Sequence, residues 1–227
     1  MEAAVASPIR AVRVQWLGRV GYDAALTLQA EAAARATRGE EETLLLLEHE
    51  PVVTLGRNAE AADVLLPSER LAELGIAVRE SNRGGKVTYH GPGQLVGYPI
   101  VNLAPDRKDV KRYVTDLEEV LISTLSDFGI QAERSPRKER VTSVWVGNDK
   151  IAAIGIHLSR WVTTHGFALN VTEEPLPHFA GIVPCGITDG GVTTMERVLG
   201  RRVAVDAVAR ALLPHFARAF GREIIAA

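Results

Sequence analysis

The stretch KIAAIGIHLSRWVTTHGFALNV, residues 150–171, places two apolar runs on either side of the turn residues Ser159 and Arg160. A further run, VTSVWV at residues 141–146, precedes it across the turn residues 147–149. Runs of β-branched and aromatic residues that are separated by short turns are typical of neighbouring antiparallel strands. The sequence therefore predicts an antiparallel meander here.

Helical patterns stand on both sides of this meander. Residues 23–37 consist of strong helix formers. Residues 109–128 repeat apolar side chains at spacings of three and four, with Asp109 as a candidate N-cap. A last amphipathic helix is predicted over residues 206–220, with a kink at Pro214.

Shorter apolar runs predict further strands. One covers residues 11–17, and residues 43–56 supply two more that Pro51 interrupts, so paired or bent strands are expected there. A short helix over residues 68–74 leads to a strand at 76–78. Strands that come in runs, with helices inserted between them, favour an α+β fold over strict alternation.

The length of the chain, 227 residues, fits one substantial domain, so we expect a single domain over residues 1–227, with room for a small C-terminal lobe. Thr193 and Glu196 have the spacing of a capping box, which predicts a short helix at this point.

Composition excludes some classes of function. The formal net charge of −2 argues against nonspecific binding of nucleic acid. The amino-terminal residues lack the pattern of a secretion signal, and no apolar run approaches the length of a membrane span. We therefore expect a cytoplasmic protein without a nucleic-acid or membrane partner. A single cysteine cannot form an internal disulfide, which suits a reducing compartment.

That only cysteine, Cys185, lies in the turn-like segment GIVPCGITDGG, residues 181–191. Proline and glycine favour a turn that presents its side chains, and reactive cysteines occupy partly open sites. A buried structural thiol is the alternative, because free cysteine also packs as a small hydrophobe. The segment alone leaves both interpretations open.

A second unusual segment is RGGKVTYHGPGQLVGYP, residues 83–99. Its glycine spacing does not match a dinucleotide fingerprint, and no Walker-type lysine is present. The glycines predict a wall for an extended ligand, with Arg83 and Lys86 available for an anionic or carbonyl end, although a purely conformational loop explains them equally well. His90 either orients this loop or assists proton transfer. His49 lacks the spacing of a metal motif, so no metal is expected.

Lys150 opens a strand that is otherwise built of Ile, Ala and Gly. Most lysines in such places point to solvent. The functional alternative is that Lys150 faces Cys185, where its charge lowers the thiol pKa from about 8.5, or where it accepts and returns the proton.

Taken together, these segments resemble one family, the lipoyl(octanoyl) transferases. The resemblance rests on motifs in the family's order, with residues 47–57, LEHEPVVTLGR, as weaker support: RGGKVTYHGPGQLVGYP (83–99), KIAAIGI (150–156), HGFALNV (165–171) and IVPCGI (182–187). The family shares the fold of biotin and lipoate protein ligases. The resemblance therefore implies a mixed, largely antiparallel sheet flanked by helices. Ser143 stands where we expect a glycine, a departure that we expect to bear on a turn.

The resemblance also implies an activity and its residues. Cys185 would carry an octanoyl group as a thioester and Lys150 would activate it, with no cofactor and no metal. The donor would be octanoyl-acyl carrier protein, and the acceptors would be lipoyl domains of 2-oxoacid dehydrogenase E2 subunits and the glycine cleavage H protein. The implied substrate-binding residues are Arg83, Gly84, Gly85, Lys86, Val87, Thr88, Tyr89, His90, Ala153, Ile154, Gly155, Gly166, Phe167 and Ala168.

Physical chemistry adds two expectations. Gly155, Gly166 and Ala168 are small residues in strands, which leave space for a ligand or for a neighbouring backbone. Acyl carrier proteins are generally acidic, so Arg57, Lys86 and the basic residues 137–140 are expected to assist docking.

Three other functions remain open. An ATP-dependent lipoate or biotin ligase shares the fold but needs no cysteine. An acyl-binding protein would keep the pocket without turnover. Octanoyl transfer from one protein amide to another would use the same cysteine with a different donor.

Overall fold

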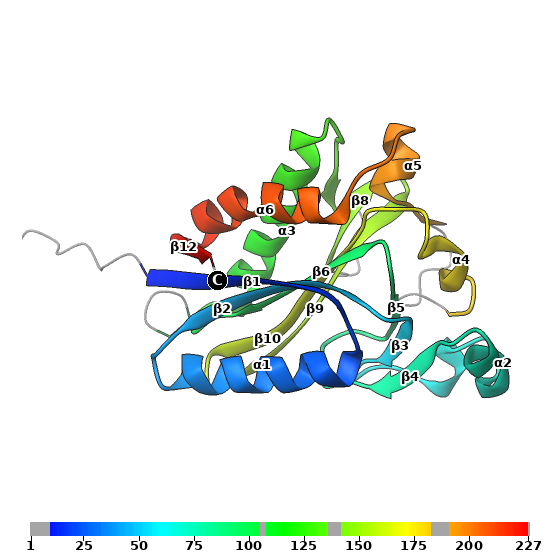
Figure 1. Cartoon of the computed structure of the whole chain (residues 1–227), viewed down its shortest axis with the longest axis horizontal. Helices are drawn as coiled ribbons and strands as arrows, with labels where there is room; N and C mark the ends of the chain where they lie inside the picture. Colours follow the sequence, from blue (N-terminus) through cyan, green and yellow to red (C-terminus); the bar gives the residue numbers. More distant parts are fainter. Residues whose placement is uncertain (1–9, 105–107, 136–141, 183–190, 227) are drawn as a thin grey trace, which may run out of the picture.

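The computed structural model describes residues 10–104, 108–135, 142–182 and 191–226 (Figure 1). A nine-stranded sheet runs through its centre, in the order β12-β1-β2-β6-β10-β9-β8-β7, with β11 paired to β9. The strands are β1 (Arg10–Val20), β2 (Glu42–His49), β6 (Gln94–Ile100), β7 (Glu133–Arg134), β8 (Ser143–Val146), β9 (Asp149–Ser159), β10 (Val162–Asn170), β11 (Gly191–Val192) and β12 (Arg222–Ala226).

The large sheet is mixed. β1 pairs parallel with both β2 and β12, and β11 pairs parallel with β9, whereas the remaining neighbours are antiparallel. Strands β8, β9 and β10 form the antiparallel meander that the sequence predicts. The α+β prediction, with a mixed and largely antiparallel sheet flanked by helices, is confirmed.

A second, three-stranded sheet has the order β4-β3-β5, with β3 at Val52–Leu55, β4 at Ala77–Glu80 and β5 at Val87–His90. The short helix α2 (Ser68–Glu73) and a 3₁₀ turn (Ala61–Asp63) accompany it. The two strands predicted around Pro51 are both present, but they do not pair with each other. Pro51 marks the bend at which the chain leaves the large sheet for the small one.

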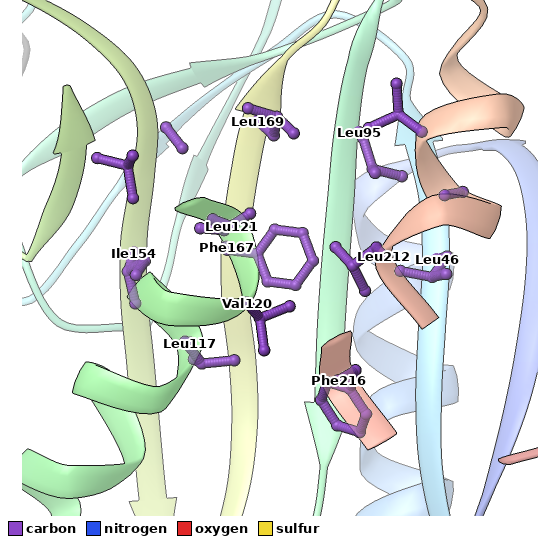
Figure 2. Close-up of a cluster of buried hydrophobic side chains, with 14 of the residues drawn as sticks. Leu46, Leu95, Leu117, Val120, Leu121, Ile154, Phe167, Leu169, Leu212 and Phe216 are labelled. Carbon is purple, nitrogen blue, oxygen red and sulfur yellow. The ribbon is translucent and has the colours of Figure 1, made fainter. Parts of the chain in front are cut away.

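Helices cover both faces of the large sheet. Figure 1 shows α1 (Tyr22–Thr37) on one face, and α3 (Val110–Asp127) with α6 (Val205–Phe220) on the other. On the α1 face, Ala25, Ala32 and Ala36 bring the helix close to the strands because their side chains are small. On the opposite face, leucine, valine and phenylalanine side chains of α3 and α6 pack on β6, β9 and β10 (Figure 2).

Of the two helix caps that the sequence predicts, one is confirmed and one is corrected. Asp109 caps α3, as predicted, by accepting a hydrogen bond from the backbone N–H of Arg112 at 2.9 Å. The predicted capping box at Thr193 is wrong by one residue, because Thr194 caps the short helix α5 (Met195–Leu199). Glu196 instead accepts from the backbone N–H of Val203 at 3.1 Å. Among the described residues, no helix combines the length and apolarity of a membrane span.

Glu42 joins three parts of the sheet. It is only 4% exposed. Its carboxylate accepts from Arg222 Nε of β12 at 2.6 Å, from the backbone N–H of Asn102 at 2.8 Å and from Arg10 of β1. The next residue, Glu41, pairs with Arg13 and Arg35 at the more open surface.

We expect Glu42→Gln to destabilise the fold by about 3–5 kcal/mol, since it removes the negative charge that faces a buried guanidinium. The matched control Glu41→Gln should cost less than about 1 kcal/mol, because that ion pair is partly solvated. Urea unfolding of the two variants measures both values. Equal losses of unfolding free energy would contradict the assignment of Glu42 as the buried anchor.

Candidate active site

A cavity of about 300 Å³ lies where the small sheet and the loop at residues 83–86 meet β9 and β10 of the large sheet. Its walls contain every predicted substrate-binding residue except Val87 and Tyr89, together with Lys150. Six further residues line the cavity without having been predicted as substrate-binding: Tyr22, Asn58, Tyr98, Thr142, Ser143 and His165. Tyr98 and His165 lie inside the family motifs at residues 83–99 and 165–171, and these motifs could have indicated them from the sequence.

The alternation of strand β5 separates the predicted residues on it. Thr88 and His90 face the cavity, whereas Val87 and Tyr89 point to the opposite side and belong to the core of the small sheet. Tyr89 stacks on His178 with ring centroids 4.8 Å apart. A contiguous motif therefore contributes only every second side chain to the cavity.

Two glycines allow backbones to meet. A Cβ atom on Gly155 would lie 2.9 Å from the carbonyl oxygen of Gly84, and one on Gly166 would lie 2.2 Å from the carbonyl oxygen of Gly97. The backbone N–H of Gly84 also donates to the carbonyl of Ile156 at 2.9 Å. A neighbouring backbone therefore approaches closely at Gly155 and Gly166, and both glycines and Ala168 also line the cavity.

Arg83 holds the loop. Its side chain is buried and donates from Nη2 to the carbonyl of Thr54 at 2.7 Å, from Nε to the Thr54 hydroxyl at 3.1 Å and from Nη1 to the carbonyl of Gly84 at 3.0 Å. Lys86 is more open, with its ammonium 3.7 Å from a carboxylate oxygen of Asp63. Arg83 thus contributes a fixed positive charge to the cavity wall, while Lys86 lies at its more solvated part.

Lys150 does not point to solvent. It is 3% exposed and lines the cavity from β9. Its main chain pairs with Val192 of β11, and its carbonyl accepts from the backbone N–H of Thr193 at 3.0 Å. Cys185 lies outside the described residues. Those residues therefore leave the predicted pairing of Lys150 with Cys185 untested.

Ser143 differs from the expectation that it would affect only a turn. It opens strand β8, is fully buried and lines the cavity. Trp145 Nε1 donates to its hydroxyl at 2.7 Å. The hydroxyl therefore helps to fix a buried tryptophan beside the cavity wall.

Three buried histidines lie in or next to the cavity wall: His90 and His165 line the cavity, and His49 contacts Tyr98, which also lines it. His49 donates from Nδ1 to the carbonyl of Val20 at 2.9 Å and accepts at Nε2 from the hydroxyl of Tyr98 at 2.7 Å. The rings of His49 and His90 are 5.6 Å apart, and His165 lies edge-on to Tyr98 at 6.1 Å. Among the described residues, no three His, Cys, Asp or Glu side chains could hold a metal ion together.

Burial keeps these rings neutral. It lowers the pKa of His49 to about 4. Burial, and then the positive charge of Arg83, lower the pKa of His165 to about 4 as well. Burial first, and the neighbouring His49 second, hold the pKa of His90 well below that of a free histidine. At neutral pH these three rings therefore add no positive charge to the cavity.

Comparisons with known proteins find a matching family model and similar chains. The family model described as the lipoyl protein ligase A/B catalytic domain matches residues 22–217. An octanoyltransferase of Solibacter usitatus is 51% identical over 210 residues, which cover 92% of this chain and 93% of that protein. An octanoyltransferase of Caldicellulosiruptor bescii is 47% identical over 215 residues, covering 94% and 93%.

Solved structures support the fold. A lipoate-protein ligase A bound with ATP has a TM-score of 0.75 at 18% identity, covering 95% of this chain and 89% of that one. The bi-partite lipoate protein ligase of Thermoplasma acidophilum has a TM-score of 0.73 at 18% identity, covering 96% and 86%.

The buried histidines predict a stability that depends on pH. Because folding lowers the pKa of His49 and His165 from 6.5 to about 4, the unfolded chain binds more protons in this interval. Stability should be complete above pH 6.5 and fall as the pH drops toward 4, by roughly 3 kcal/mol for each ring. Urea unfolding at pH values across this interval measures the slope.

The variant His165→Gln serves as the comparison, since it removes one of the buried titrating rings. Its unfolding free energy should change less steeply with pH than that of the parent protein. A parent protein whose unfolding free energy is constant across this interval would show that folding does not lower the pKa of these histidines.

Proposed function

The chain belongs to the family of lipoyl protein ligase A/B catalytic domains and, within it, to the octanoyltransferases, and from this membership we propose that it transfers octanoyl groups through a thioester on Cys185. The proposed donor is octanoyl-acyl carrier protein. The proposed acceptors are lysines of lipoyl domains, those of 2-oxoacid dehydrogenase E2 subunits and of the glycine cleavage H protein. We place this reaction in the cytoplasm.

The observation that carries the proposal is the burial of Lys150 in the cavity wall. An ammonium group taken out of water is costly unless a negative charge or hydrogen bonds compensate it. The strand that pairs with Lys150, β11, begins six residues after Cys185 in the chain. A thiolate on Cys185 would be one such negative charge if it lay beside Lys150, and the ammonium would then lower the pKa of the thiol.

The cavity also has walls that suit an acyl chain. Ala153 and Ala168 line it, and Ile154 and Phe167, whose side chains belong to the hydrophobic core, contribute to the same wall. Each methylene of an octanoyl chain that leaves water there would stabilise the complex by about 0.8 kcal/mol. Contact along the chain would therefore favour a medium-length acyl group over a much shorter one.

The reaction has two transfers. In the first, the Cys185 thiolate attacks the thioester carbonyl of the donor, a new C–S bond forms, and the carrier's sulfur leaves as a thiolate that takes a proton from solvent. In the second, the acceptor amine attacks the enzyme thioester, the C–N bond forms, the nitrogen loses one proton that passes to solvent, and the Cys185 thiolate leaves. Lys150 remains an ammonium and stabilises the Cys185 thiolate in both transfers.

The ligase alternative uses ATP and a free acid. The solved ligases share only the fold with this chain at 18% identity, whereas relatives near 50% identity are octanoyltransferases. This difference favours transfer from a thioester donor. Full activity that requires ATP and survives Cys185→Ser would support the ligase instead.

The single cysteine makes the mechanism directly measurable, because alkylation of the folded protein reports on Cys185 alone. We expect the pH profile of iodoacetamide alkylation to give a thiol pKa below the ordinary value of about 8.5, and Lys150→Gln to move it back toward that value. Mass spectrometry with octanoyl donor alone should detect an acyl-enzyme in the parent protein and none as a thioester in Cys185→Ser.

Lys86→Gln is a matched control for Lys150→Gln, since it also removes one lysine charge from the cavity but at the more solvated part. The thiol pKa in this control should stay near that of the parent. A parent thiol that titrates near its ordinary value, or an acyl group that never appears on Cys185, would refute the thioester mechanism.

Docking of an acidic carrier predicts a salt-dependent effect of Arg57. This side chain is exposed, and its Nη2 lies 2.9 Å from Nδ1 of His157 near the cavity. Of the other predicted docking residues, Lys86 lines the cavity, and 137–140 lie outside the described residues. Arg57→Glu should raise the donor KM by roughly 3–10-fold at low salt, with little change in kcat, because charge at an interface rim acts mainly on encounter.

The control Arg210→Glu reverses a charge on α6, outside the cavity lining. Its donor KM should match that of the parent protein. If Arg57→Glu and Arg210→Glu raise the donor KM equally, net charge explains the effect and Arg57 has no particular part in docking.

A further inference from the structure

A chain of buried polar groups leads from the cavity to the main chain beside Lys150. His90 Nδ1 and Gln94 Oε1 are 2.7 Å apart, Gln94 Nε2 donates to Asn170 Oδ1 at 2.8 Å, and Asn170 Nδ2 donates to the carbonyl of Thr193 at 3.1 Å. The backbone N–H of Thr193 in turn donates to the carbonyl of Lys150. All the side chains of this relay, His90, Gln94 and Asn170, are at least nine-tenths buried.

The direction of the relay follows from its far end. A main-chain carbonyl can only accept a hydrogen bond, so the amide nitrogen of Asn170 must face Thr193 and its oxygen must face Gln94. Gln94 then presents its nitrogen to Asn170, and also to the carbonyl of Tyr89 at 3.4 Å, and its oxygen to His90. His90 therefore carries its proton on Nδ1.

This tautomer leaves the other ring nitrogen as an acceptor. His90 lines the cavity, and its Nε2 makes no hydrogen bond to any residue in the described ranges. The same cavity is lined by Lys150, whose ammonium has three donors and no acceptor. A group that enters the cavity thus meets a hydrogen-bond acceptor at His90 and a hydrogen-bond donor at Lys150.

We propose that His90 Nε2 accepts the proton of the attacking lysine amine in the second transfer, and that Gln94 and Asn170 are positioning residues that hold His90 in the tautomer this requires. The inference rests on the proposed function. It assigns a catalytic role to a residue that the family resemblance gives only as substrate-binding.

The protons and electrons of the step balance. Attack of the neutral amine on the enzyme thioester forms the C–N bond and leaves a positive charge on nitrogen and a negative charge on the carbonyl oxygen. His90 Nε2 takes one proton from that nitrogen, the C–S bond breaks, and Cys185 leaves as a thiolate. His90 then returns its proton to solvent.

The electrostatics of the cavity fit this order of events. Burial and neighbouring His49 and Arg83 keep the pKa of His90 low before reaction, so that its Nε2 lone pair is available at neutral pH. A negative oxyanion that forms in the same cavity raises the pKa of the ring, since an opposite charge favours the protonated form. The ring therefore becomes a stronger base at the moment when the amine must lose its proton.

The test separates the two transfers. His90→Asn keeps a side-chain N–H for Gln94 but has no second nitrogen. In rapid-mix mass spectrometry, its acyl-enzyme should form within about three-fold of the parent rate, whereas transfer from isolated acyl-enzyme to an apo lipoyl domain should slow by about 100-fold or more. Gln94→Leu, which frees the ring to adopt the other tautomer, should slow the second transfer by roughly 10-fold or more and spare the first.

His215→Gln is the control, because His215 lies on α6, outside the cavity lining, and pairs there with Asp127. It should not separate the two rates. A second transfer in His90→Asn that keeps the parent rate, or two transfers that slow by the same factor, would overturn the inference.

Nitrogen NMR of the parent protein gives a readout that does not depend on the folding of any variant. We expect the shifts of His90 to report Nδ1–H and an unprotonated Nε2 at neutral pH, and Gln94→Leu to change them. An Nε2–H tautomer in the parent would overturn the inference. Absence of any acyl-enzyme in the parent would instead refute the proposed function, so the two failures are distinguishable.

Discussion

The structure depends on the close approach of main chains at Gly155 and Gly166. The carbonyls of Gly84 and Gly97 occupy the space where Cβ atoms would stand, so a side chain at either position would push the loop at residues 83–86, or β6, away from β9 and β10. That approach fixes the loop against the large sheet and forms the cavity between them. Arg83, bonded to Thr54, holds the same loop from the side of the small sheet.

The cavity combines buried basic side chains with neutral histidines. Lys150 and Arg83 are buried and line it, whereas burial lowers the pKa of His49, His90 and His165. Such a site favours a thiolate or an oxyanion. In the proposed reaction, the neutral imidazole of His90 would accept the proton that the acceptor lysine loses.

Sequence predicted what local patterns determine and missed what tertiary contacts decide. The meander and α3 with its Asp109 cap follow from alternation, helical spacing and capping, all of which act within a few residues. The separation of β2 and β3 into two sheets depends on distant partners. The resemblance implies that residues 83–90 all bind substrate. Alternation along β5 instead turns Val87 and Tyr89 into the core of the small sheet, and only the packed structure shows which face of β5 lines the cavity.

The parallel pairing of β12 with β1 has a consequence for biosynthesis. Residues 222–226 complete the edge of β1 at residues 10–14, and Arg222 adds its bond to Glu42 there. A ribosome that makes the protein from its amino terminus releases β1 long before residues 222–226 exist, so one side of β1 stays open until they emerge. Until that point the nascent chain exposes a strand edge with which other chains can pair.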